Sequence, residues 1–402
     1  MSDWISASEA LSRLGVRPQT LYAYVSRGRV QATPDPAEPR RSRYRASDVA
    51  ALATRKARGR KVADVAEGVM AWGEPVLSSS ITTVADGRLF YRGRDAAALA
   101  ETETLEGVAR LLRGRSETAQ PRTARDRPPS GDTARARTFA ALADRAARDA
   151  PVRGRAPGDL AVEAATLIDV LADAVTGTAD GGAIHERLGR AWGCGRAGMD
   201  LIRRALVLLA DHELNASTFA VRVTVSTGAS LSAAALAGLA ALSGPLHGGV
   251  FADVALLADE ARRTGPRETV AARLAHGVAA PGFGHPLYPE GDPRARALFG
   301  AFQPSPTLEA LRGEMLAANG ARHNVDFALA AVTEALGLPS EAPFALFAVA
   351  RCAGWMAHAM EQVEGGALIR PRARYTGPAP KIALDRRYLG GRAAAAADRS
   401  AY

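Results

Sequence analysis

The sequence predicts a mainly α-helical protein with a small separate module at its N-terminus. Apolar residues recur at three- and four-residue spacing, the period of an amphipathic helix, over 159–175, 198–210, 229–242, 268–279, 307–318 and 326–336. One β signal stands apart, because two β-rich runs between Ser80 and Arg92 flank Asp86-Gly87, a dipeptide that favours a tight hairpin turn. With 402 residues, the chain is long enough for two or three domains and a large buried core.

The first 55 residues have the pattern of a helix-turn-helix module. They predict a helix over 6–14 that ends at Gly15, a second helix over 16–25 with Pro18 in its first turn, a polar stretch over 34–45 and a third helix over 47–52. Two short helices joined by a tight turn are typical of such units. The module resembles the winged helix-turn-helix of MerR-like regulators and excisionases, in which the second helix enters the major groove.

Most of the positive charge lies in this module and the charged linker over 56–61. Residues 1–61 contain 13 Lys or Arg against 5 Asp or Glu, a net charge of +8, and the whole chain carries +9. Such a basic block favours an anionic partner. If that partner is DNA, the residues expected to face the groove are Arg17, Gln19, Thr20, Tyr22 and Arg27. The alternative is a retained fold that serves dimer contacts or regulation.

Composition and cysteine usage indicate a soluble protein of a reducing compartment. The hydrophobic fraction of 47% and the charged fraction of 23% are those of an ordinary globular chain. Cys194 and Cys352 lack metal-ligand spacing, so we expect no metal site. The sequence shows no leader-like start and no run of roughly 20 apolar residues, and we expect a cytoplasmic protein without membrane contact. The proline-rich polar stretch over 121–133 predicts a mobile loop.

Three short motifs place catalytic residue types beside glycine or at polar breaks. Gly-Pro-Leu-His-Gly-Gly at 244–249 supplies His247, Gly-Phe-Gly-His at 282–285 supplies His285, and Asn-Val-Asp-Phe at 324–327 supplies Asp326. Further candidates elsewhere in the chain are His212, Arg294, Arg351 and Arg370. Such a set can bind a small dicarboxylate, polarise a carbonyl and remove a proton from carbon, which points to an enzyme.

Read together, six strings resemble citrate synthase over about residues 62–390. They are His212-Glu-Leu-Asn-Ala-Ser-Thr, Gly-Pro-Leu-His247-Gly-Gly, Gly-Phe-Gly-His285 with Asp292-Pro-Arg294-Ala, Asn-Val-Asp326-Phe, Arg351-Cys-Ala-Gly-Trp-Met-Ala-His, and Arg370-Pro-Arg-Ala-Arg-Tyr-Thr-Gly. The resemblance implies a citrate synthase-like two-domain helical fold behind the winged module. The expected boundaries are 1–56 for the helix-turn-helix, 57–248 and 338–402 for the large domain, and 249–337 for the small domain.

The resemblance also implies the activity, a reaction of the tricarboxylic acid cycle. A homodimer with its site between the domains would condense acetyl-CoA with oxaloacetate and then hydrolyse the thioester, with no permanently bound cofactor. By resemblance Asp326 takes the methyl proton, His247 donates to the thioester oxygen and His285 polarises the ketone. His212 would bind oxaloacetate. The planar guanidinium of an arginine can pair with a carboxylate through two hydrogen bonds. The arginines that match the family's carboxylate-binding positions are Arg294, Arg351 and Arg370, and the resemblance implies that Arg370 reaches in from the partner subunit.

Other interpretations stay open at this point. A histidine or arginine taken alone is more often a packed or surface residue, and Asp326 could serve only as a first-turn helix charge. We expect His323 and His358 to be structural. Three segments depart from the family pattern and would shape the pocket, which leaves propionyl-CoA, as in 2-methylcitrate synthases, as an alternative substrate: 250–253, 286–289 and 327–330. A DNA-binding regulator with a citrate synthase-like sensor domain is the other alternative.

Overall fold

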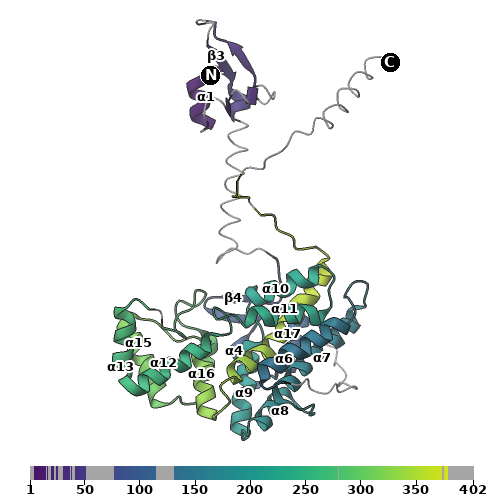
Figure 1. Ribbon diagram of the computed structural model, residues 1–402, viewed down its shortest axis with the longest axis vertical. Helices are drawn as coiled ribbons and strands as arrows, with labels where there is room; N and C mark the ends of the chain where they lie inside the picture. The colour runs from purple at the N-terminus through teal and green to yellow at the C-terminus, as the bar shows by residue number, and fades with distance from the viewer. Residues whose placement is uncertain are drawn as a thin grey trace. The chain divides into compact units, whose positions relative to one another are not determined.

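The computed structural model describes residues 4–14, 16, 20–21, 24–25, 30–36, 38, 41–50, 77–114, 131–278, 280–373 and 375–378 (Figure 1). The chain divides into two compact units, Met1–Ser78 and Ser79–Tyr402. The boundary expected at residue 56, the charged linker over 56–61 and most of the predicted loop over 121–133 lie outside the described residues.

The first unit contains a three-stranded antiparallel sheet and short helices. Its described elements are β1 (Trp4–Ser6), α1 (Ala7–Leu14), β2 (Ala32–Pro34) and β3 (Ser42–Arg45), with sheet order β1-β3-β2. The first predicted helix is confirmed, and Ser6 Oγ accepts the amide proton of Glu9 at 3.2 Å, which caps the helix. Residues 20–21 and 24–25 of the second predicted helix and 46–50 around the third are helical. The ends of the polar stretch pair as β2 and β3.

The second unit begins with the predicted hairpin, which is confirmed. Strand β4 (Thr82–Ala85) pairs with β5 (Arg88–Tyr91), and β6 (Arg94–Asp95) extends the sheet. Asp86 (φ 49°) and Gly87 (φ 68°) both have positive φ, as a two-residue type I′ turn requires. The buried Tyr91 hydroxyl lies 3.1–3.2 Å from the carbonyl oxygens of three residues at the end of the helix before His212, and so holds the hairpin there.

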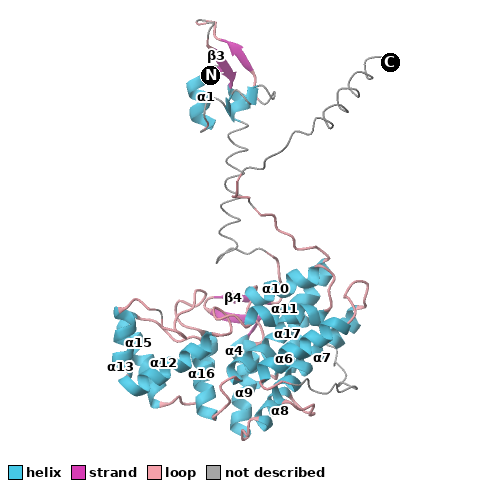
Figure 2. Cartoon of the chain, in the orientation of Figure 1, coloured by secondary structure: helices cyan, strands magenta, loops and turns pink. Residues whose placement is uncertain are grey.

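The rest of the second unit is helical, as Figure 2 shows. Its helices are α4 (Ala96–Thr102), α5 (Leu105–Arg113), α6 (Ala134–Arg148), α7 (Pro157–Thr176), α8 (Ile184–Ala191), α9 (Arg196–Leu209), α10 (Ala216–Ser226), α11 (Leu231–Leu242), α12 (Val250–Thr264), α13 (Pro266–Ala275), α14 (Pro293–Phe299), α15 (Pro306–Asn319), α16 (Val325–Leu336) and α17 (Ala342–Gly365). All six helices expected from apolar spacing are present, with ends shifted by a few residues. No helix in the described ranges is long and apolar enough to cross a membrane.

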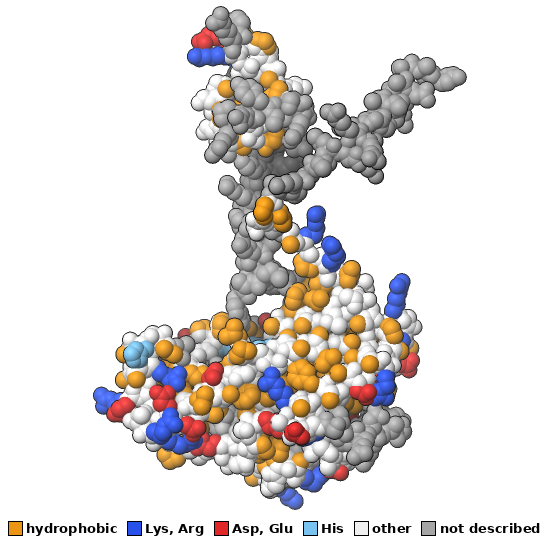
Figure 3. Space-filling view, viewed as in Figure 1, with side chains coloured by type: hydrophobic (Ala, Val, Ile, Leu, Met, Phe, Trp, Pro, Cys, Tyr) orange, Lys and Arg blue, Asp and Glu red, His pale blue; other side chains and the backbone are white. Residues whose placement is uncertain are grey.

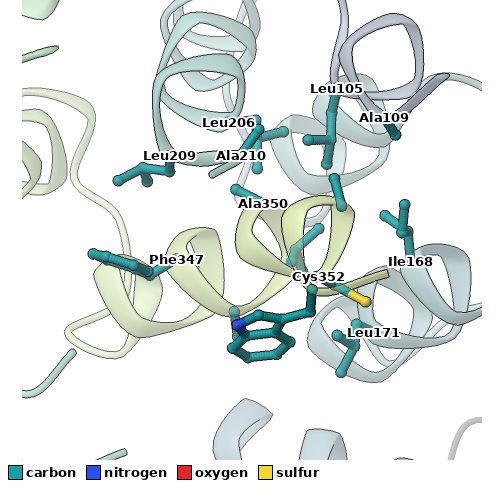
Figure 4. Packing of buried hydrophobic residues seen from close by; sticks show 14 of the residues in the cluster. Leu105, Ala109, Ile168, Leu171, Leu206, Leu209, Ala210, Phe347, Ala350 and Cys352 are labelled. Carbon is teal, nitrogen blue, oxygen red and sulfur yellow. The ribbon is translucent and has the colours of Figure 1, made fainter. Parts of the chain in front are cut away.

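Two hydrophobic clusters organise these helices. The larger is built around α17, which is buried on all sides from Ala342 to Met360, as expected of a central core helix. Figure 4 shows Phe347, Ala350 and Cys352 of α17 packed among residues of α5, α7 and α9. The smaller cluster joins α12, α13, α15 and α16. Helix α16 contributes to both, because Val325 and Leu329 belong to the larger cluster and Phe327 to the smaller.

Candidate active site

The loop between α9 and α10 contains His212 and has a strained backbone at the next residue, Glu213. Glu213 has a left-handed φ of 51°, uncommon for a residue with a side chain, and its carboxylate accepts the Val84 amide proton from β4 at 2.8 Å. Asn215 caps α10 and also donates its side-chain amide to the His212 carbonyl at 3.2 Å. Hairpin and helix cap therefore fix the position of a buried histidine.

The loop before α14 brings a second histidine against the first. The rings of His212 and His285 meet edge-to-face at 5.2 Å. Tyr288, in the same loop, has its ring 4.9 Å from His285 and its hydroxyl 2.9 Å from His212 Nε2. Gly282 is required here, because a Cβ would lie 2.8 Å from a side-chain carbon of Val254 and φ is +82°.

A buried ion pair joins this loop to the start of helix α16. Asp292 binds Arg294 bidentately, with Nε at 3.0 Å and Nη2 at 2.8 Å, and also accepts the Val325 amide proton at the start of α16 at 3.0 Å. Burial alone would raise the pKa of Asp292, but Arg294 holds it below its usual value. The same carboxylate therefore orients an arginine and anchors α16.

Asp326 lies in the first turn of α16. Asn324 caps the helix, and its Oδ1 accepts the Asp326 amide proton at 3.0 Å. Burial raises the pKa of the Asp326 carboxyl to about 6, with Arg294 and Arg351 pulling it down and Asp292 pushing it up. A carboxylate with this pKa is ionised at neutral pH yet basic enough to accept a proton.

His247 is held by a residue that sequence reasoning missed. Its Nε2 lies 2.9 Å from the hydroxyl of Ser217, which is buried in α10. That hydroxyl also receives the Trp355 indole proton at 3.2 Å and lies 2.7 Å from Asn215 Oδ1. Burial, followed by Arg351, lowers the pKa of His247 to about 4, so the ring is neutral at physiological pH.

The other two imidazoles of the site, those of His285 and His212, are neutral for the same reason. Burial, then Arg294, lowers the pKa of His285 to about 4, although Asp292 opposes the shift. Burial, Arg294 and Arg351 lower the pKa of His212 well below its usual value. Because His285 Nδ1 accepts the Leu287 amide proton at 3.2 Å, the ring proton of His285 sits on Nε2.

Arg351 is a buried cation of this site with an unpaired donor among the described residues. Its Nε donates to the Leu209 carbonyl at 2.9 Å, and its Nη2 has no hydrogen-bond partner among the described residues. Burial lowers its pKa to about 10, with Asp211 opposing and Arg294 adding to the shift. An unpaired buried guanidinium donor is costly, and a bound carboxylate would satisfy it.

The outcome differs for Arg370 and for the proposed DNA-contacting residues. Arg370 is exposed beyond the end of α17, and no described contact of this chain joins it to the other site residues. Of the proposed DNA-contacting residues, Thr20 is helical and partly buried, and the other four lie outside the described residues: Arg17, Gln19, Tyr22 and Arg27.

Several side chains are structural. His358 is fully buried between Asp211, at 3.2 Å, and Arg222, at 3.2 Å. His323 stacks edge-to-face on Phe299 at 4.9 Å. Within the segment over 327–330, which we expected to shape the pocket, the first three residues are instead buried in the hydrophobic clusters, because their helix faces α12 and α17.

A small cavity opens beside His285. It has a volume of about 100 Å³ and is lined by the loop over 284–292 and by residues 320–324, including Asp292 and Asn324. Among the described residues, no cluster of three or more His, Cys, Asp or Glu side chains could hold a metal ion. The histidines, arginines and carboxylates of this site can form hydrogen bonds and act as general acids or bases.

Comparison with known proteins decides the family. A model of the citrate synthase C-terminal domain matches residues 132–372, more than half of the chain. The chain belongs to the citrate synthase family. Among solved structures, citrate synthase from Thermotoga maritima superposes with a TM-score of 0.62 at 27% identity over 78% of this chain and 97% of that one. Citrate synthase from Thermoplasma acidophilum, in complex with carboxymethyl coenzyme A and oxaloacetate, gives 0.64 at 26% identity over 77% and 96%.

Curated citrate synthase relatives align over a shorter stretch. Citrate synthase 2 of Bacillus subtilis is 39% identical over 194 residues, which are 45% of this chain and 51% of that protein. Citrate synthase of Haloferax volcanii is 41% identical over 189 residues, 43% and 49% of the two chains. The 2-methylcitrate synthase of Mycobacterium tuberculosis is 34% identical over 193 residues, 44% and 48%. The chain thus spans about half the length of the curated relatives it matches.

Proposed function

We propose that this chain is an acyltransferase that joins the methyl carbon of acetyl-CoA to the keto carbon of oxaloacetate and, with water, releases citrate and CoA. The observation that carries the proposal is the raised pKa of the Asp326 carboxyl beside two buried arginines. Its pKa of about 6 is set by burial and by Arg294 and Arg351, the two buried arginines that also depress the pKa of His212. One site thus combines a carboxylate that is ionised but basic at neutral pH, neutral imidazoles, and cations suited to a dicarboxylate.

Oxaloacetate binding would use the two arginines and His212. Asp292 occupies Nε and Nη2 of Arg294, so a substrate carboxylate would meet the remaining Nη1. Arg351 offers its unpartnered Nη2. His285 would donate its Nε2 proton to the keto oxygen, which makes the keto carbon more electrophilic.

Carbon–carbon bond formation would follow removal of a methyl proton by the Asp326 carboxylate. His247 would stabilise the resulting enolate by donating from Nδ1 to the thioester oxygen. This role requires Ser217 to donate its hydroxyl proton to His247 Nε2 rather than to Asn215. The enolate carbon then attacks the keto carbon, the alkoxide takes the His285 proton, and water cleaves the thioester to citrate and CoA.

The two hydrophobic clusters support a division into a large domain and a small domain over 249–337. Helices α12 to α16 lie in that range, and α16, which carries Asp326, packs into both clusters. Rotation of the smaller cluster would carry the base toward the other groups and exclude water.

Cys194 and Cys352 are free, which supports a reducing, cytoplasmic location.

A homodimer would complete the site with Arg370 of the partner subunit. Hydrophobic side chains gather over α6, α7 and α11 on the face seen in Figure 3, and Val162 of α7 is 50% exposed. Mixed dimers test this. Arg370→Ala and Asp326→Asn chains should each be inactive, and refolding them together should restore roughly a quarter of wild-type activity, because half of the dimers would carry one complete site. No recovery would place Arg370 outside the partner's site.

The activity itself is tested by thiol release. The protein is mixed with acetyl-CoA or propionyl-CoA and with oxaloacetate or other 2-oxo acids, and free CoA is measured. We expect turnover with acetyl-CoA and oxaloacetate. Preference for propionyl-CoA would instead support a 2-methylcitrate synthase, the activity named for a relative that is 34% identical. Silence with every pair would refute the proposal.

The N-terminal unit supports a second role in DNA binding. Its described residues include a three-stranded antiparallel sheet and helical residues in each of the three predicted helices, and residues 1–61 carry a net charge of +8. Binding to duplex DNA should weaken steeply with salt, because it would rest on phosphate contacts. A ligand-dependent, sequence-specific complex combined with no thiol release would support the regulator instead of the enzyme. If the protein does not bind duplex DNA even at low salt, the DNA-binding role is refuted and the unit is a structural module.

A further inference from the structure

Tyr288 stands at the centre of the groups that would bind the keto acid. Its side chain is 2% exposed, its ring lies 4.9 Å from the His285 ring, and the Arg294 guanidinium lies 5.6 Å from its ring centre. The hydroxyl is 2.9 Å from His212 Nε2, which is its one hydrogen bond in the described part of the chain. No catalytic role proposed above uses this hydroxyl.

The geometry allows two proton arrangements in the pair of Tyr288 and His212. In the first, the phenol donates to Nε2 and the ring proton of His212 sits on Nδ1. In the second, Nε2 donates to the phenol oxygen, and the buried phenol proton has no acceptor among the described residues. A buried donor without an acceptor is costly, whereas Nδ1, which carries the unpaired proton in the first arrangement, is not among the fully buried atoms that lack a partner in the described residues. The first arrangement is therefore favoured.

Both groups remain neutral, which keeps this arrangement over the working pH range. Burial raises the pKa of the Tyr288 hydroxyl above its ordinary value, although Arg294 opposes the shift. Burial, Arg294 and Arg351 depress the pKa of His212. The ring proton of His212 therefore sits on Nδ1, which has no hydrogen-bond partner within the described ranges.

We propose that Tyr288 is a positioning residue that fixes His212 as an Nδ1–H donor to the 2-oxo acid. The inference rests on the proposed function for its substrate, but the tautomer itself is a property of the protein without substrate. Tyr288 acts on the keto-acid side of the site. Its loss should weaken oxaloacetate binding and leave acyl-CoA binding unchanged.

The test compares Tyr288→Phe, which removes the hydroxyl and keeps the ring, with wild type. The Michaelis constant for oxaloacetate should rise about 3- to 10-fold, the range expected for one neutral hydrogen bond, while that for acetyl-CoA stays within about twofold. A purely structural role would move both constants together. An unchanged constant for oxaloacetate would overturn the proposal.

A double-mutant cycle with His212→Asn isolates the coupling. If Tyr288 acts through His212, adding Tyr288→Phe to His212→Asn should produce no further rise in the oxaloacetate constant. Independent, additive effects would contradict a positioning role. Tyr288→Leu, which also removes the ring, separates loss of the hydroxyl from loss of packing against His285.

Nitrogen NMR of protein labelled in its histidine rings reads the tautomer without turnover. Signals missing from the His212→Asn spectrum assign His212. Wild type should show a protonated Nδ1 and an unprotonated Nε2, and Tyr288→Phe should show a mixture of tautomers. A protonated Nε2 in wild type would refute the inference even if thiol release is normal. The expected tautomer in a protein that releases no thiol would refute the proposed function alone.

Discussion

Replacing the proposed base with its neutral isostere, Asp326→Asn, should abolish thiol release and at the same time stabilise the protein. The Asp326 carboxyl has a pKa of about 6 in the folded chain against 3.8 for the ordinary group. The folded state therefore holds this proton more tightly than the unfolded state. The associated stability is fully present below pH 3.8 and is lost as pH rises through about 6.

The difference of about 2.2 pH units corresponds to roughly 3 kcal/mol that the ionised carboxylate costs the fold above pH 6. At pH 5 the same pair of pKa values gives about half that cost. An asparagine has no proton to lose and escapes the penalty at every pH. The variant should therefore gain most at pH 8 and less at pH 5.

The assay is the thermal unfolding midpoint of wild type and Asp326→Asn at pH 5 and pH 8. Asp253→Asn is the matched control, because Asp253 is an exposed aspartate in the first turn of α12 and should give no gain. The variant midpoint should exceed that of wild type at pH 8, with a smaller gap at pH 5. A lower midpoint at pH 8, or a gap that is equal at both pH values, would refute the conclusion that the ionised Asp326 carboxylate costs the fold stability.

Three further predictions concern turnover. The pH profile of kcat/KM should rise through about pH 6 with the slope of one proton and stay flat to pH 8, because Asp326 ionises there and the imidazoles are neutral; a limb near pH 7 would point to a histidine base. Ser217→Ala should lower kcat about 10- to 100-fold with little change in the Michaelis constant for oxaloacetate, since His247 loses its hydrogen-bond partner; Thr224→Val, on an α10 threonine whose hydroxyl bonds the Ala220 carbonyl, serves as its control. Arg351→Lys should raise the oxaloacetate constant by about tenfold or more, because lysine keeps the charge and loses the planar fork, and steady-state kinetics with both substrates would detect it.

The sequence carried enough information for the helices, the hairpin and the residue types of the site. Apolar spacing identifies helices because it records which face is buried, and Asp86-Gly87 identifies the turn because few residue pairs accept two positive φ values. The short strand over 42–45 was not foreseen. Three of its four residues are polar or charged, and only Tyr44 is buried, so no period-2 pattern is visible.

The supporting side chains escaped sequence reasoning because their partners are distant along the chain. Tyr288 bonds a histidine 76 residues away, and Ser217 bonds one 30 residues away. Both lie in segments already named from the sequence, the string from His212 to Thr218 and the segment over 286–289, but local spacing assigns neither of them its partner. Arg370 is a different case, because its proposed role depends on a second chain that one sequence cannot place.

The most direct test of the account is exchange of the acetyl-CoA methyl protons with solvent. Acetyl-CoA is incubated with the protein in deuterated water together with a four-carbon 2-hydroxy dicarboxylate, which can occupy the keto-acid site and cannot accept the carbon nucleophile. Proton NMR should show loss of the methyl signal with wild type and none with Asp326→Asn. Equal exchange in both proteins, or no exchange in a wild type that binds both ligands, would contradict proton removal by Asp326.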